Sequence, residues 1–108
     1  MKRRHGHTPK YSLELVQELA AAGGTRVQFT KSAIAGAQAL GLEVADIAEC
    51  VCALTEGDYE QTLESTKIPG TFQDVYKPRH RGFEIYLKVR LIDDRKVLVI
   101  SFKRNTSP

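Results

Sequence analysis

The alternation of apolar and polar residues is clearest between Gly82 and Lys103. Every second position of the first half is apolar, namely Phe83, Ile85, Leu87, Val89 and Leu91. After a polar break at residues 93–96 the alternation resumes, with Leu98, Ile100 and Phe102 on one side. Two alternating runs around a short polar loop predict an antiparallel hairpin with one buried face.

Parity restricts the register of this hairpin, because a slip of one residue turns every apolar side chain to the wrong face. Closure at Ile92 and Val97 gives three apolar pairs: Leu91 with Leu98, Val89 with Ile100, and Leu87 with Phe102. The outer pairs are then Arg90 with Val99, Lys88 with Ser101, and Tyr86 with Lys103. This outer face is either a functional surface or a solvated face on which lysines guard against aggregation.

Helical spacing of apolar residues predicts three helices ahead of the sheet. The first is capped by Ser12 and ended by Gly23, and the second begins at Thr30 and is ended by Gly41. The third covers residues 42–54. Residues 55–64 are predicted as a fourth short helix, because Thr55 and Asp58 approximate a capping box. Residues 26–29 are extended, and 71–77 form a strand closed by Pro78. The fold class is therefore α+β, with N-terminal helices packed on a small C-terminal antiparallel sheet.

The sequence divides into a basic flexible arm (1–11), a single domain (12–104) and a polar tail (105–108). No apolar run approaches the roughly 20 residues that cross a bilayer. No apolar segment follows the basic N-terminus either, so a secretory signal is not predicted and the expected location is the cytoplasm.

Charge is unevenly distributed along the chain. The net charge is +4 over residues 1–10, −7 over 11–66 and +6 over 67–108. A basic sheet half attracts polyanions, of which nucleic acid is the obvious candidate. A DNA-binding regulator is disfavoured, because the helical half that would supply a recognition helix is acidic.

The two cysteines, Cys50 and Cys52, fall in the third predicted helix. Side chains two residues apart on a helix point in different directions, so these thiols neither form a disulfide nor share a metal ion easily. We expect both to be buried and reduced. The histidines, His5, His7 and His80, are far from them in sequence, so no metal site and no cofactor are predicted.

Catalytic candidates come from the expected strand pairing. If residues 71–77 pair with 82–89 across a four-residue turn, Phe72 meets Leu87 and Asp74 faces the core. Gln73, Tyr86 and Lys103 then lie in a row across three strands, ~5 Å apart. Such a row suits cleavage of RNA without metal, because the 2′-hydroxyl is an internal nucleophile. Tyr86 serves as acid, base or hydrogen-bond donor, Lys103 stabilises charge or shares in proton transfer, and Gln73 orients the RNA.

From Lys31 to Phe102 the chain resembles the MqsR (motility quorum-sensing regulator) family of bacterial toxins. The matching runs are TKSAIAGAQALGLEVADI, ALTEGDYEQTL, FQDVYKPR, EIYLKV and VLVISFK. The resemblance implies a RelE-like fold and an mRNA interferase that cuts at short GC-containing sequences. It also implies neutralisation by an MqsA-like antitoxin, with a zinc-binding part and a helix-turn-helix part.

The resemblance carries catalytic roles onto Gln73, Tyr86 and Lys103. It also implies a lysine at the position of Gln61, which has no charge. The first hypothesis is therefore a metal-independent endoribonuclease whose RNA contacts are Lys77, Arg79, Arg81, Lys88 and Arg90. The alternative is a weak or inactive module that binds RNA or the antitoxin. His80 is more simply a surface histidine than a proton shuttle.

Overall fold

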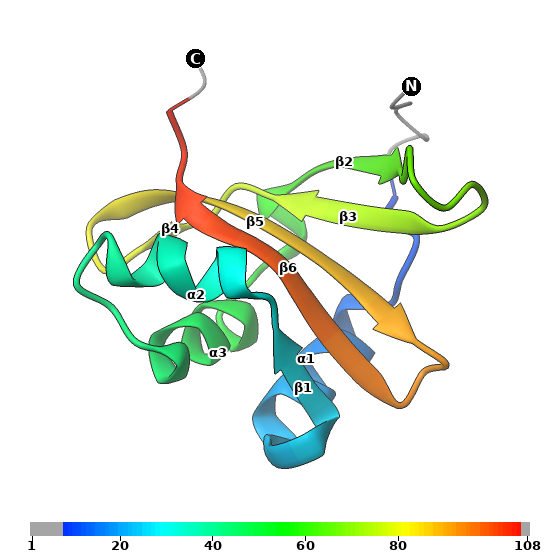
Figure 1. The fold of residues 1–108 in the computed structure, drawn as a ribbon, viewed down its shortest axis with the longest axis horizontal. Helices are drawn as coiled ribbons and strands as arrows, with labels where there is room; N and C mark the ends of the chain where they lie inside the picture. The colour runs from blue at the N-terminus through cyan, green and yellow to red at the C-terminus, as the bar shows by residue number, and fades with distance from the viewer. Residues whose placement is uncertain (1–7, 107–108) are drawn as a thin grey trace.

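The computed structural model describes residues 8–106, in which helices pack against a six-stranded sheet (Figure 1). The helical elements are α1 (Leu13–Ala22), η1 (Gly24–Arg26), α2 (Lys31–Gln38), α3 (Val44–Cys52) and η2 (Glu56–Asp58). The strands are β1 (Val27–Phe29), β2 (Tyr59–Glu64), β3 (Phe72–Tyr76), β4 (Arg79–His80), β5 (Phe83–Ile92) and β6 (Lys96–Arg104). The predicted α+β class is confirmed.

The long hairpin β5–β6 lies at the centre of the sheet. The strand order is β1-β6-β5-β3-β2, with β1 parallel to β6 and the other pairs antiparallel. In the view of Figure 1, α1 lies behind β1 and β6, α2 runs beside the upper part of β6, and α3 lies below α2. Among residues 8–106, no helix lies over the face of β5 and β6 toward the viewer, and we call it the open face.

The core lies between the sheet and the helices. It is built from apolar residues of the helices and of the covered sheet face, including Val16, Leu19, Ile47, Val51, Tyr76, Ile85, Leu87, Val89, Val97, Val99 and Phe102. The strand interiors are rich in valine, isoleucine and phenylalanine, which suit a half-buried pleated surface. Within residues 8–106 no helix is long and apolar enough to cross a membrane.

The helices begin where the sequence offers caps. Ser12 Oγ accepts a hydrogen bond from Leu15 N at 3.2 Å, and Thr30 Oγ1 accepts one from Ala33 N at 3.0 Å. These bonds satisfy N–H groups that a helix leaves unpaired at its start. The third helix is shorter than predicted, and Val44 at its first position is 37% exposed.

A β-bulge corrects the predicted hairpin register. Tyr86 pairs with Lys103, Leu87 with Phe102 and Lys88 with Ser101, as predicted, but Val89 then pairs with Val99 and Leu91 with Val97. Ile100 is the extra residue of β6. A bulge reverses the parity of the strand beyond it. Val97 and Val99 are therefore buried, whereas Leu98 and Ile100, predicted to be inward, lie half-buried on the open face.

Thr30 holds the bulge in place. Its Oγ1 donates to the carbonyl of Ile100 at 2.7 Å, and its backbone N–H donates to the carbonyl of Val99 at 3.1 Å. One hydroxyl thus caps α2 and satisfies a carbonyl at the bulge. Just beyond, a Cβ on Gly36 would collide with the carbonyl oxygen of Phe102, so α2 lies directly against the backbone of β6 and covers its edge.

The pairing of β3 with β5 also differs from the prediction. Tyr76 pairs with Leu87, and Arg79 of β4 pairs with Glu84 in the same register. The hairpin therefore continues past Pro78 and closes at Arg81 and Gly82, whose φ angles are +51° and +83°. Positive φ at both central residues is the geometry of a two-residue turn that suits strand twist. The predicted four-residue turn is wrong, and the register shifts by four residues.

Residues 55–64 are not a helix. The Thr55–Asp58 capping box is present, but it closes a single 3-10 turn, η2. Residues 59–64 then form strand β2, which pairs with β3 and contains a register shift between Tyr59 and Gln61. Pairing with β3 therefore overrides the helical spacing of Tyr59 and Leu63 in this segment.

Asp74 is a buried carboxylate on the core side of β3, at 1% exposure. It accepts hydrogen bonds from the backbone N–H groups of Lys10 and Tyr11, both at 2.9 Å, and from Thr62 Oγ1 at 2.6 Å. These donors offset the cost of burying the charge. The C-terminal end of the predicted arm is therefore held against β3, while residues 1–7, where the rest of that prediction falls, lie outside the described residues.

The two cysteines differ in exposure. Cys50 is buried at 1% exposure, and burial raises the pKa of its thiol to about 12. Cys52 is exposed, so the prediction that both thiols are buried is wrong for this residue. Both are free thiols, as predicted. The third helix has one covered face, and residues two apart cannot both lie on it.

The hydroxyl of Thr30 is expected to stabilise the fold. Thr30→Val keeps the side-chain shape but removes the helix cap and leaves the Ile100 carbonyl without this donor. We expect the free energy of unfolding in urea to fall by about 1–3 kcal/mol. The matched control is Ser32→Ala, which removes an exposed hydroxyl group from the same helix. Equal stability of the two variants would contradict the role given to Thr30.

Candidate functional site

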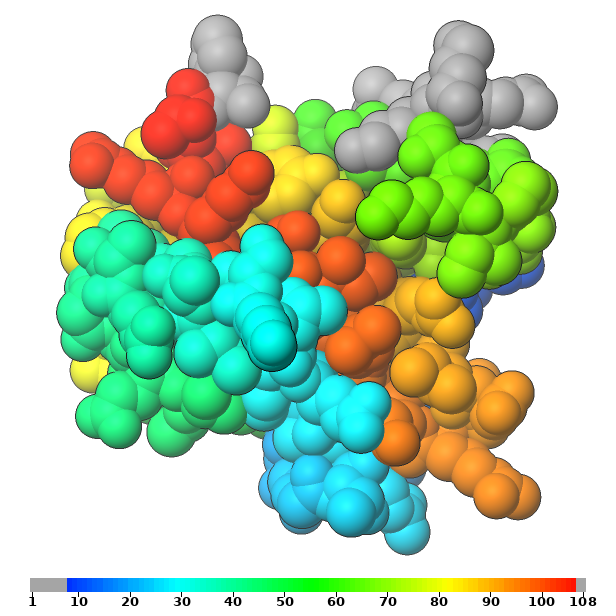
Figure 2. Space-filling view, viewed as in Figure 1, coloured from blue at the N-terminus to red at the C-terminus, as the bar shows by residue number. Residues whose placement is uncertain are grey.

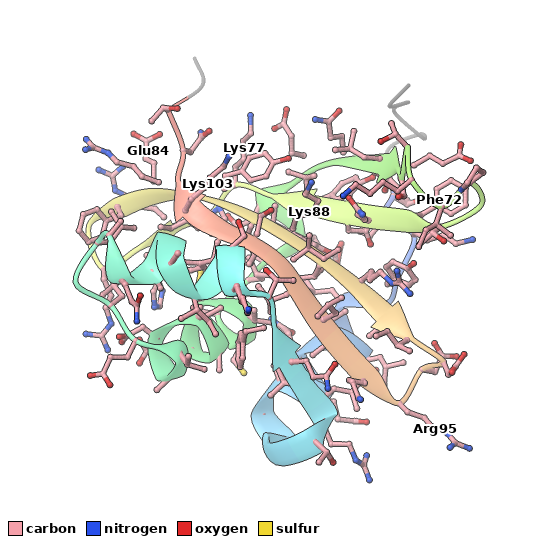
Figure 3. The ribbon with its side chains drawn as sticks, viewed as in Figure 1. Phe72, Lys77, Glu84, Lys88, Arg95 and Lys103 are labelled. Carbon is pink, nitrogen blue, oxygen red and sulfur yellow. The ribbon has the colours of Figure 1, made fainter. Side chains whose placement is uncertain are left out.

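A tyrosine flanked by two lysines lies on the open face. Tyr86 of β5 pairs with Lys103 of β6, and the register of β3 and β4 places Lys77 opposite Tyr86 on the other side. Lys103 Nζ lies 5.3 Å from the centroid of the Tyr86 ring. Neighbouring strands are ~4.8 Å apart, so these three residues form one row across the sheet. Figure 3 labels both lysines near the upper end of the hairpin.

The Tyr86 phenol is half-buried although it lies on the open face. Burial raises its pKa above the ordinary value of 10, because the phenolate loses hydration. At neutral pH the side chain is therefore a protonated O–H group. It suits the donation of a hydrogen bond or a proton better than the abstraction of one.

The two lysines of this row have different surroundings. Lys77 Nζ lies 3.9 Å from a carboxylate oxygen of Glu60 on β2, and its side chain is 25% exposed. Lys103 is exposed near the end of β6 and packs its Cβ close to Gly36 of α2. A phosphate bound beside Tyr86 would thus meet a solvent-facing cation on the β6 side and a partly paired one on the β3 side.

Two further cations follow Tyr86 along β5. Lys88 is half-buried, in register with Ser101 on one side and Val75 on the other. Arg90 comes next, and its buried Nε has no hydrogen-bond partner among residues 8–106. Both were predicted as RNA contacts, and both belong to the polar side of β5. They extend the positive charge of the row along the strand.

Gln73 does not join the row of Tyr86 and Lys103. The observed register places it opposite Arg90, four residues or about 13 Å along the strand from the level of Tyr86. Lys77 occupies the position predicted for Gln73. The two-residue turn causes this exchange, and the sequence Arg81-Gly82 is the signal that would have indicated it, because Gly favours positive φ.

Gln73 instead lines a depression of about 300 Å³ on the open face. Its walls come from the β2–β3 loop, from β5 and from the bulge in β6, and its lining residues are Ser65, Thr66, Lys67, Gln73, Lys88 and Ile100. Figure 2 shows the green loop standing beside the orange surface of the hairpin. Sequence reasoning did not select Ser65, Thr66 or Ile100, and Ile100 reaches this depression only because of the bulge in β6.

The cations of the 77–82 segment point in different directions. Arg81 binds α3, with its Nη2 2.8 Å from Glu49 and its Nε 3.2 Å from Asp46. His80 Nε2 also lies 3.0 Å from Glu49. Arg79 is highly exposed and lies 3.8 Å from Glu84. Arg81 and His80 therefore link the β4–β5 turn to the helical side, and an RNA contact for Arg79 or Arg81 stays a prediction.

Gln61, where the resemblance implies a lysine, lies on β2 rather than on a helix. It pairs with Val75, which in turn pairs with Lys88. Residues that pair across a sheet share a face, so Gln61 belongs to the open face, one row from Tyr86. A lysine there would add a cation to the same surface.

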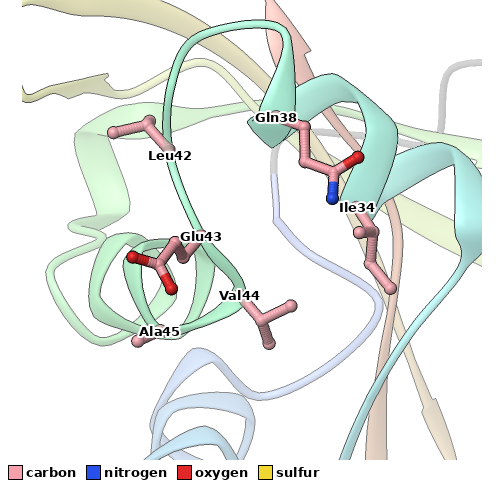
Figure 4. Close-up of a pocket in the computed structure, with 6 residues that line it drawn as sticks. All are labelled: Ile34, Gln38, Leu42, Glu43, Val44 and Ala45. Carbon is pink, nitrogen blue, oxygen red and sulfur yellow. The ribbon is translucent and has the colours of Figure 1, made fainter.

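A second hollow, of about 250 Å³, lies between α2 and α3 (Figure 4). Ile34, Gln38, Leu42, Glu43, Val44 and Ala45 line it. Its lining is largely apolar and includes one carboxylate and no cation. It lacks the positive charge that a phosphate backbone requires, so the open face is the better candidate for a nucleic-acid site.

Residues 8–104 match the protein family described as "Motility quorum-sensing regulator, toxin of MqsA". The chain is also 35% identical over 96 residues to the mRNA interferase toxin MqsR of Escherichia coli (strain K12). That alignment covers 89% of this chain and 94% of the relative. A match over nearly the whole domain establishes that the chain belongs to the MqsR toxin family.

Proposed function

We propose that this protein is an endoribonuclease toxin that cleaves mRNA on the open face of its sheet. The observation that carries the proposal is the row Lys77, Tyr86 and Lys103, in which a protonated phenol lies between two cations. A relative that is an mRNA interferase supports the choice of RNA as substrate. In the cytoplasm, cleavage of mRNA would inhibit translation and growth.

The proposed reaction is transesterification within the RNA. The 2′-oxygen attacks the adjacent phosphorus, the O2′–P bond forms, and the P–O5′ bond breaks. The 2′-proton passes to water on this open face, and Tyr86 gives its proton to the departing 5′-oxygen. The phenolate then regains a proton from water. The products are a 2′,3′-cyclic phosphate and a 5′-hydroxyl end.

The cations bind the RNA and stabilise its developing charge. The exposed Lys103 ammonium neutralises the equatorial oxygens of the phosphorane, as an oxyanion-stabilising group does. Lys77 and Arg90 bind neighbouring phosphates, Lys88 contacts the RNA one row along from Tyr86, and Arg79 contacts the strand further along. Gln73 orients the RNA through its amide, which does not titrate. No metal ion is needed, because the substrate supplies the nucleophile.

The proposed partner is an MqsA-like antitoxin that contains a zinc-binding part and a helix-turn-helix part. The description of the family calls its members toxins of MqsA, which supports an MqsA-like protein as the partner. The proposed cleavage sites are short GC-containing sequences, as the resemblance implies.

Gln61 favours a second candidate function. It places a neutral amide on the open face where the resemblance implies a lysine. The alternative is a weak or inactive module that still binds RNA or the antitoxin. Loss of one cation reduces the binding of the phosphate backbone, but it leaves the row around Tyr86 intact.

The first prediction concerns cleavage. In EDTA the protein should cut a defined mRNA and leave 5′-hydroxyl ends. Tyr86→Phe should lower the rate by about 10²–10⁴-fold, since it removes the proton donor. Lys103→Ala should lower it by about 10²–10³-fold. Lys31→Ala, an exposed lysine on α2, is the charge-matched control. An inert wild type that still binds RNA would instead support the binding module.

The second prediction concerns the ionisation of Tyr86. Burial disfavours the phenolate, so the pKa is raised and the phenol should lose its proton above pH 10 in the folded protein. The measurement is the absorbance of phenolate near 295 nm during an alkaline titration, taken as wild type minus Tyr86→Phe. A midpoint at or below pH 10 would show that Tyr86 is not protected and would weaken its assignment as a proton donor.

The third prediction concerns Gln61. Gln61→Lys adds a cation to the open face and should strengthen RNA binding, with a slope of log K against log salt steeper by about 0.7. If the missing cation limits activity, the cleavage rate should rise as well. Gln61→Met, of similar size and no charge, is the control. An unchanged salt slope in Gln61→Lys would show that RNA does not pass this position.

A further inference from the structure

We propose that the depression lined by Gln73 and the β2–β3 loop is a base-reading subsite that takes the acceptor-rich edge of one guanine. This inference rests on the proposed ribonuclease function and assigns sequence recognition to residues apart from the reacting row. The polar residues that line the depression are Ser65, Thr66, Lys67, Gln73 and Lys88, and its apolar wall is Ile100.

Position along the strand supports a subsite next to the reacting row. Lys88 lies two residues beyond Tyr86 on β5, which is a distance of ~7 Å on the same face. An RNA strand whose phosphate lies at Tyr86 and Lys103 therefore reaches the depression with a neighbouring nucleotide. Single-stranded bases are splayed out and recognised along their edges in this way.

The polar groups of the depression are rich in donors. Lys67 and Lys88 bring ammonium groups, and the amide of Gln73 brings an NH₂. Ser65 Oγ already accepts from the backbone N–H groups of Lys67 and Ile68, each at 3.2 Å, so its own O–H remains as a donor. Guanine presents two adjacent acceptors, O6 and N7, and lysine is a common partner of both. Adenine presents an amino group at the position of O6, and the two ammonium groups, which only donate hydrogen bonds, cannot pair with it.

The shape of the depression depends on two local features. Ile100 reaches the open face because the bulge in β6 reverses the parity of the strand, and it offers an apolar surface to a base. The loop is tied at its base by Ser65 N to Thr71 O at 2.8 Å and by Gly70 N to Glu64 Oε2 at 3.0 Å. Both walls are therefore positioned before RNA arrives, which favours selective binding.

The test measures binding without cleavage. Fluorescent 8-nucleotide RNAs, 2′-O-methylated throughout, carry one central guanine, adenine or 7-deazaguanine in a uridine background, and fluorescence anisotropy gives the Kd. Wild type should bind the guanine RNA about tenfold more tightly than the adenine RNA. The 7-deazaguanine RNA should lose part of this preference, because it lacks N7.

Substitutions then test which residues cause the preference for guanine over adenine. Lys67→Ala and Gln73→Leu should bind the guanine and adenine RNAs equally, whereas Tyr86→Phe should keep the preference. Arg95→Ala removes a cation at the far turn of the hairpin, as labelled in Figure 3, and should behave as wild type. A preference that survives both pocket substitutions, or is absent from wild type, overturns the subsite.

Because the methylated RNAs cannot be cleaved, the guanine preference is measured independently of cleavage. The subsite and the ribonuclease can therefore each be overturned without the other. Cleavage of unmodified RNA by a protein that binds all three oligonucleotides equally, or binds none of them, overturns the subsite and leaves the ribonuclease intact. A guanine preference that depends on Lys67 and Gln73, in a protein that cleaves no RNA, supports the subsite and overturns the ribonuclease.

Discussion

The bulge at Ile100 is the constraint on which the arrangement of the sheet depends. Phe102, Val99 and Val97 all line the core, and no regular strand places residues 97, 99 and 102 on one face. One extra residue lets both ends of β6 turn their apolar side chains to the core. The hydroxyl and backbone N–H of Thr30 donate hydrogen bonds to the carbonyls of Ile100 and Val99 at this point. Because Thr30 also caps α2, the bulge fixes the point at which β1 ends and the helix begins to cover the edge of β6. The buried face, the edge cover and the open face therefore follow from one irregularity.

This geometry separates two kinds of chemistry on the open face. On the side of the bulge toward the C-terminus, the regular pairing of Tyr86 with Lys103 is preserved, and Lys77 completes the row from the other side. At the bulge itself, Ile100 turns outward beside Lys88 and the β2–β3 loop. A protein that cuts a single strand at chosen sequences needs a place for the reacting phosphate and another for a base. The proposed positions for the phosphate and the base lie within two residues of each other on β5, without a deep cleft.

The features that the sequence predicted correctly are those encoded locally. The caps at Ser12 and Thr30, the hairpin and the pair Tyr86–Lys103 each depend on a short pattern. The bulge was not predictable from alternation, because residues 97–100 are all apolar and either parity fits such a run. The displacement of Gln73 had a different cause, since Pro78 suggested a strand end while the chain continued to a tight turn at Arg81 and Gly82. The helix predicted over residues 55–64 is wrong because pairing with β3 decides the structure of residues 59–64. No local sequence pattern carries that information.

The division of the chain into an acidic half and a basic half has a structural use besides the proposed attraction of RNA. Asp46 and Glu49 of the acidic helices bind Arg81 and His80, which fastens the β4–β5 turn to α3 and fixes where β5 begins. The Arg81 guanidinium held in this way contributes little field to the opposite face, because its charge is compensated by Glu49 at 2.8 Å. The open face gains its positive potential from side chains within the strands instead. Net charge alone therefore overstates the area of the proposed RNA-binding surface, which follows the alternation along β5 and β6.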